Sequence, residues 1–117
     1  MSDAQDRITA AKLWYWQRIS AMVLALCVVI HIAIMIYAVR GGLSAAEILG
    51  RTRGSYAFAS FYAVFVLACA VHVPIGLMRI AEEWFGFGRI AAIVLSKAFG
   101  LAILVLGLRA VVGVFSA

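Results

Sequence analysis

The chain has 117 residues, of which 67% are hydrophobic and only 13% are charged, and its formal net charge is +5. Soluble domains average about 45–50% apolar and about 25% charged residues. A domain this small cannot keep so much apolar surface out of water, so a stand-alone soluble enzyme is excluded. We expect a single membrane domain over residues 1–117, held largely in lipid.

Three stretches are long enough to cross a bilayer, which takes about 20 mostly apolar residues. Residues 19–39 and 54–78 contain no Asp, Glu, Lys or Arg, and the third stretch contains only Lys97 and Arg109. None of the three alternates apolar and polar residues as a barrel strand would. The pattern predicts an all-α integral membrane protein with three transmembrane helices, over about residues 14–39, 55–82 and 90–115.

The connection between the first two spans, residues 40–53, contains a short helix signal. Ser44 and Glu47 have the spacing of a capping box, in which each side chain bonds the backbone N–H of the other residue. Gly50 follows and is a residue type that ends helices. We therefore predict a short surface helix that ends near Gly50.

The basic residues flank the spans and indicate an orientation. The Lys/Arg bias favours an N-terminus on the inside, with five basic residues on that face against four on the other. Cations at span ends are typical anchors for anionic membrane lipid. No basic patch is left over for nucleic acid, so we expect no nucleic-acid partner.

His72 lies inside the second predicted span, where ionisable residues are costly and usually functional. At 100° per residue, Gly76, Arg79 and Glu83 lie within about 40° of it on one helical stripe. The stripe combines an imidazole that can ligate a metal, a gap without a side chain, a cation and a carboxylate. A flat macrocycle needs such clearance beside its axial ligand. The alternative is that His72 only hydrogen-bonds across helices and stabilises the bundle.

His31, in the first span, is a second candidate haem ligand. Counting at about 1.5 Å per residue places it deeper than His72, so the two could share one iron only if helix tilt or a kink removed the offset. The alternative is again an interhelical hydrogen bond.

Four other residues in the spans are unusual: one has two alternative roles, and the other three are interpreted as structural. Lys97 either snorkels to the interface or pairs with a haem propionate or an acidic neighbour. Pro74 frees a backbone carbonyl and predicts a kink. Cys27 and Cys69 lack a Cys-x-x-Cys partner, so we interpret both as small packing residues.

These motifs occur in a recognisable order. Residues 18–21 (Arg-Ile-Ser-Ala) open one helix, and His72 and Gly76, followed by Glu83 and Trp84, close the next. This arrangement resembles the small membrane-anchor subunits, including cytochrome b subunits, of succinate dehydrogenase and fumarate reductase. The likeness extends over nearly the whole chain: its length, its three spans, their orientation and the order of the motifs.

The resemblance implies a second membrane-anchor subunit that pairs with this chain into a six-helix unit. It also implies a haem b with His72 as one axial ligand and the other ligand from the partner chain. A quinone, ubiquinone or menaquinone, would bind near the inner face. The positions that match the family's quinone site are Arg18, Ser20, Glu83 and Trp84.

The chain departs from the family at three positions. Trp84 stands where family members often have Tyr, which exchanges a phenol for an indole N–H donor. Gln17 stands where cytochrome b subunits often have His, and Trp14 where some members have the serine that contacts quinone. His31 lies outside the family pattern, so it stays a second candidate ligand for haem.

The chain cannot oxidise a dicarboxylate by itself. It has no Gly-rich dinucleotide loop, and its two cysteines cannot hold an iron–sulfur cluster. The resemblance implies that a flavoprotein subunit and an iron–sulfur subunit dock on its inner face, in a bacterial inner (cytoplasmic) membrane, and pass electrons to quinone. Two alternatives stay open: a haem-free structural anchor of the same complex, or a small transporter or assembly subunit using both histidines as a proton path.

Overall fold

The structure, a computed structural model, describes residues 2–117 as four helices: α1 (Ser2–Gly41), α2 (Ala45–Thr52), α3 (Tyr56–Glu83) and α4 (Arg89–Ser116). This part of the chain contains no strand. The three long helices, α1, α3 and α4, are each long and apolar enough to cross a membrane. The predicted all-α class and the three spans are therefore confirmed, and the chain is a multi-pass membrane protein.

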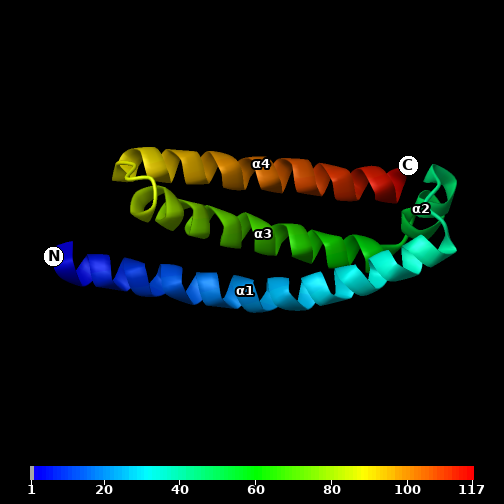
Figure 1. Ribbon diagram of the computed structural model, residues 1–117, viewed down its shortest axis with the longest axis horizontal. Helices are drawn as coiled ribbons and strands as arrows, with labels where there is room; N and C mark the ends of the chain where they lie inside the picture. Colours follow the sequence, from blue (N-terminus) through cyan, green and yellow to red (C-terminus); the bar gives the residue numbers. More distant parts are fainter. Residues whose placement is uncertain (1) are drawn as a thin grey trace.

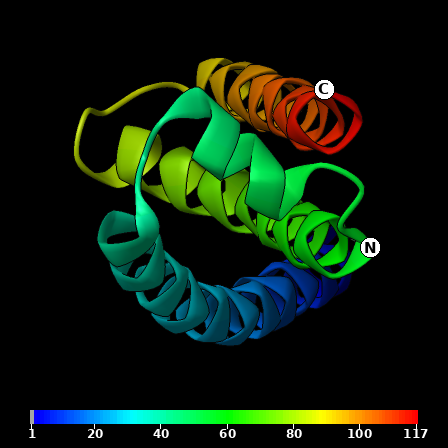
Figure 2. The same ribbon diagram turned by 90° about the vertical axis from the view of Figure 1, so that its right-hand side faces the viewer.

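The three long helices lie side by side with α3 in the middle (Figure 1). The helix α3 packs mainly against α4 on one side and against α1 on the other. Seen along the bundle, α1 and α4 lie on opposite sides of α3, and α2 crosses one end (Figure 2). We call this the α2 end. The opposite end, with the α3–α4 connection and the N-terminus of α1, is the α3–α4 end.

The helix α1 is longer than the sequence predicts, because it begins at Ser2 rather than near residue 14. Its 40 residues make it about 60 Å long, twice the roughly 30 Å of a hydrocarbon core. The first turns are polar and exposed but rich in good helix formers such as Ala and Gln. A helix already nucleated in the membrane extends into such a segment without a new nucleation cost.

Two glycines allow α3 and α4 to approach closely. A Cβ on Gly100 would overlap the ring of Pro74, and a Cβ on Gly107 would lie 2.6 Å from Cγ1 of Val66. Small residues at such contacts are the usual device for packing helices in lipid. The helix α3 continues through Pro74 without interruption.

The side chains that face away from these contacts are mostly apolar and exposed, as lipid requires. Cys27 is buried and Cys69 is half-buried, and both are free thiols. Their positions within the helix packing agree with the interpretation of both as small packing residues.

The α2 end is closed by hydrogen bonds to backbone carbonyls. The hydroxyl of Thr52 donates to the carbonyl oxygen of Val114 at 2.9 Å, and the N–H of Gly54 donates to that of Phe115 at 2.9 Å. These bonds satisfy carbonyls that the last turn of α4 would otherwise leave unpaired.

The predicted capping box of α2 is confirmed. The Ser44 hydroxyl accepts from the N–H of Glu47 at 3.2 Å, and the Glu47 carboxylate accepts from the N–H of Ser44 at 3.0 Å. The helix continues past Gly50 and ends at Thr52, two residues later. The glycine that reverses the chain is Gly54, whose φ of +68° is a left-handed conformation that favours glycine.

The capping box predicts a pH dependence of α2. The backbone N–H of Ser44, followed by its hydroxyl, lowers the pKa of Glu47 below the ordinary value of 4.5. Because the folded pKa is depressed, the carboxylate stabilises α2 above pH 4.5 and this contribution is lost as pH falls through the folded pKa. We expect amide-exchange protection of α2 to decrease over that range, and the Glu47→Gln variant to show a flat profile. Equal pH profiles for both proteins would contradict this role.

Candidate functional site

The imidazole of His72 faces α1 at the α1–α3 interface. Its Nδ1 lies 3.3 Å from the hydroxyl oxygen of Ser20, which in turn lies 3.1 Å from the backbone carbonyl oxygen of Gln17. Ser20 is 5% exposed and His72 is half-buried. A hydrogen-bonded chain therefore leads from the imidazole to the backbone of α1.

The donor and acceptor roles in this series of hydrogen bonds follow from the number of protons available. A carbonyl oxygen only accepts and a hydroxyl has one proton, so Ser20 donates to Gln17 and accepts from His72. The tautomer assigned from this network carries its proton on Nδ1 of His72. The lone pair then lies on Nε2, the arrangement in which a neutral imidazole binds a metal while its other nitrogen is held by an acceptor.

The gap at Gly76, one turn after His72, also faces α1. The amide nitrogen of Gln17 lies 3.3 Å from the position that a Cβ on Gly76 would take. The clearance predicted beside His72 is therefore filled by a flexible side chain within this chain. The Oε1 atom of Gln17 is buried and has no hydrogen-bond partner among the residues that the structure describes. This unpaired acceptor beside the imidazole is a polar feature of the site that a bound group could satisfy.

His31 has an equivalent contact nearer the α2 end. Its Nδ1 lies 2.9 Å from the hydroxyl oxygen of Tyr62 on α3. The rings of Tyr62 and Phe65 meet the imidazole edge-on, with centroids 5.7 and 5.6 Å away. This pair joins the same two helices as the His72–Ser20 pair.

The two histidines lie at different depths. His31 is level with Tyr62, which precedes His72 by ten residues on α3, so the imidazoles are about 15 Å apart along the bundle. Neither tilt nor a kink removes the offset predicted from the sequence. Within one chain, the two imidazoles cannot ligate the same iron.

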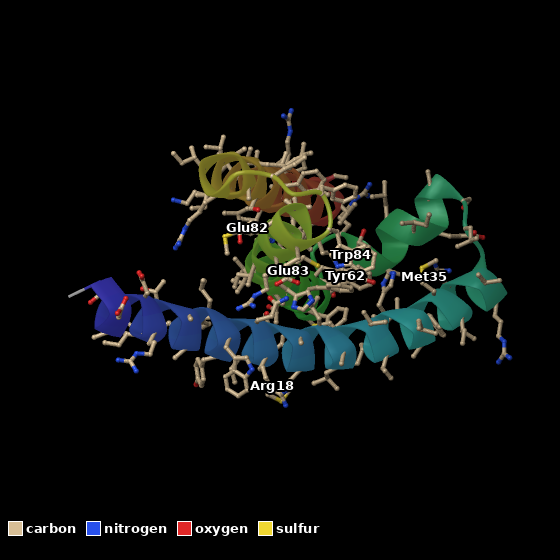
Figure 3. All side chains as sticks on the ribbon, turned by 60° about the vertical axis from the view of Figure 1, so that its left-hand side comes forward. Arg18, Met35, Tyr62, Glu82, Glu83 and Trp84 are labelled. Carbon is tan, nitrogen blue, oxygen red and sulfur yellow. The ribbon has the colours of Figure 1, made fainter. Side chains whose placement is uncertain are left out.

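The residues matched to a quinone site do not come together in this chain. Arg18 extends from the face of α1 turned away from α3, whereas Glu83 and Trp84 lie at the end of α3 (Figure 3). The guanidinium of Arg18 stacks over the ring of Trp14, 5.2 Å from its centroid. Ser20 is buried and bonded to His72. Trp84 is 79% exposed, so its indole N–H is accessible at the α3–α4 end.

Lys97 and His72 lie on different faces of the bundle. Lys97 lines a groove between α3 and α4 together with Pro74. Pro74 follows His72 by two residues, which turns it by about 200° around α3. The ammonium of Lys97 is therefore not brought to the imidazole of His72 in this chain.

Two residues of the α1–α3 interface have contacts that sequence reasoning does not find: Gln17, noted only as a departure from the family, and Tyr62. Both are polar residues inside a span, which is a signal of function or of helix contact. The residues that they contact depend on the register between α1 and α3. The periodicity of one helix does not predict that register.

Within residues 2–117 no group of three or more His, Cys, Asp and Glu side chains is arranged to hold a metal ion. A haem iron needs only one or two axial ligands from protein, and His72 has the tautomer and the second hydrogen bond that such a ligand requires. An apolar groove of about 220 Å³ adjoins Ser20 between α1 and α3. The chemistry of His72 therefore suits an axial haem ligand, whereas the gap at Gly76 beside it is filled by Gln17 and His72 does not line this groove.

Comparison of the chain with models of protein families, with curated proteins and with solved structures finds no match.

Proposed function

We propose that the chain is a haem b-binding membrane anchor of a succinate dehydrogenase or fumarate reductase type of complex. The observation that supports this best is the contact of His72 Nδ1 with the Ser20 hydroxyl, because the tautomer assigned from it leaves the lone pair on Nε2. A second membrane-anchor subunit would supply any further ligand, because His31 lies about 15 Å away along the bundle.

In this function the chain holds and orients the haem and the quinone. Its partner subunits carry out the chemistry on the dicarboxylate. A bound haem would supply one-electron storage. His72 would hold the iron through Nε2, Ser20 would fix the plane of its ring, and the backbone carbonyl oxygen of Gln17 accepts a hydrogen bond from the Ser20 hydroxyl. A flavoprotein subunit and an iron–sulfur subunit deliver electrons at the α3–α4 end, which we assign to the inside of a bacterial inner membrane.

The proposed quinone contacts are divided between this chain and its partner. Arg18 lies two residues from Ser20, so it is level with Pro74 on α3 and about 14 Å from Glu83 along the bundle. We therefore assign a quinone carbonyl to the indole N–H of Trp84 and proton delivery to Glu83. Arg18 contacts quinone only at a site that the partner subunit completes. Ser20 is not a quinone contact, because it is hydrogen-bonded to His72.

The Trp84→Ala variant should lose quinone reduction and keep haem. Removing the indole N–H removes the donor to the quinone carbonyl, and a lost hydrogen bond of this kind raises the barrier by about 1–3 kcal/mol, or about five- to 150-fold in rate. The measurement is quinone reduction by the purified complex, with its haem absorbance as the control. Unchanged reduction would place the quinone elsewhere.

The direct test of haem binding is the absorbance spectrum of the purified complex after reduction by dithionite. A b-type α-band in proportion to this chain is expected. A spectrum without that band would leave a haem-free structural anchor, in which the His72–Ser20 bond only joins α1 to α3.

A further inference from the structure

A second polar feature lies on the opposite side of α3 from His72. A groove of about 350 Å³ runs between α3 and α4. The two helices touch within it at Gly100, where a Cβ would overlap the ring of Pro74. Its lining consists of one basic, two small and three larger apolar residues: Lys97, Ala70, Gly100, Pro74, Leu101 and Leu104.

The groove has a charged end and an apolar end, ordered along the membrane normal. Lys97 lies eight residues after Arg89, the start of α4, so it is about 12 Å from the helix end. Leu101 and Leu104 follow about one and two turns deeper. A cation near the surface followed by an apolar wall toward the bilayer centre matches the polarity of a phospholipid.

No acidic residue lies level with Lys97 on α3 or α4. The sequence between Glu47 and Glu82 contains no acid, and α4 has none at all. From the contact of Gly100 with Pro74, Lys97 is level with about Leu77, so Glu82 lies about 8 Å further along α3. A cation at this depth is costly unless it is paired or reaches a headgroup.

We propose that this groove binds one anionic phospholipid, with its phosphate on Lys97 and one acyl chain along Leu101 and Leu104. A basic pocket between transmembrane helices near a membrane surface is a recurring binding site for anionic headgroups. An apolar partner helix would cover the same groove but would leave Lys97 without a counter-ion in hydrocarbon. An anionic lipid pairs its phosphate with the charged end of the groove and its acyl chain with the apolar end. This proposal does not depend on haem binding.

The test is native mass spectrometry of the purified complex titrated with dioleoylphosphatidylglycerol or with dioleoylphosphatidylcholine. The unmodified complex should retain one phosphatidylglycerol at concentrations where it retains no phosphatidylcholine. Lys97→Gln should weaken this binding at least tenfold, and Lys97→Arg should preserve it. Arg109→Gln, at the other end of α4, is the matched control and should bind as the unmodified complex does.

Equal binding by Lys97→Gln and the unmodified complex, or equal retention of the two lipids, would overturn the proposal. The haem spectrum of Lys97→Gln distinguishes the two possible partners of this residue, a lipid phosphate and a haem propionate. An unchanged spectrum with lost lipid supports the lipid site. A shifted or missing haem band with lipid retained would assign Lys97 to a haem propionate instead.

Discussion

The His72→Ala variant should assemble without haem b and lose the reduced α-band entirely. Alanine has no lone pair to give to iron, and the partner's single ligand does not retain the group in a fixed position. The Ser20 hydroxyl keeps its bond to the carbonyl oxygen of Gln17, so no buried donor is stranded on α1. The measurement is the reduced-minus-oxidised spectrum of the purified complex, normalised to this chain.

His31→Ala is the matched control, because His31 also bonds a hydroxyl across the α1–α3 interface. It should keep the full α-band, while any loss of stability from a broken interhelical bond should be similar in the two variants. If His31→Ala lost the band and His72→Ala kept it, the ligand assignment would be wrong.

Gly107→Ala should destabilise the helix bundle by about 1–3 kcal/mol, the usual cost of inserting a methyl group into a packed contact. Its Cβ would lie 2.6 and 2.8 Å from the two γ carbons of Val66, and neither α3 nor α4 can yield without loosening the contacts along their length. The measurement is the midpoint of unfolding in a titration of mixed micelles with dodecyl sulfate, followed by circular dichroism.

Gly113→Ala is the control for the intrinsic effect of the substitution. Gly113 is also within α4, and a Cβ there would meet no atom within 4 Å. Alanine favours helix over glycine by about 1 kcal/mol, so this variant should be unchanged or more stable. A Gly107→Ala protein as stable as Gly113→Ala would mean that α3 and α4 do not pack through this contact.

The features that the sequence predicts correctly are those set by a single segment. Uncharged runs determine the three spans, because charge in hydrocarbon is costly wherever the helix lies in the bundle. The spacing of Ser44 and Glu47 determines the cap of α2, because both partners are three residues apart. The helix α1 begins earlier than the sequence predicts, because a polar segment ends a membrane span without ending the helix.

The features that the sequence does not predict depend on the register between helices. The pairs Ser20–His72 and His31–Tyr62 share one antiparallel register of α1 against α3, and Gln17 beside Gly76 follows the same register. Periodicity identifies the stripe of His72 but not the helix that covers it. The stripe therefore faces α1, with Gln17 in the gap that the sequence alone indicates as open.

The account's central claim is that this chain anchors a flavin- and iron–sulfur-containing complex in the membrane. The most direct measurement is to purify the tagged chain from its own membrane in mild detergent and assay the product for flavin fluorescence and for iron–sulfur electron paramagnetic resonance. The account predicts covalent or tightly bound flavin, iron–sulfur signals and a second small hydrophobic subunit, in fixed proportion to this chain. A pure product with neither flavin nor iron–sulfur signal, which still moves protons when reconstituted in vesicles, would contradict it.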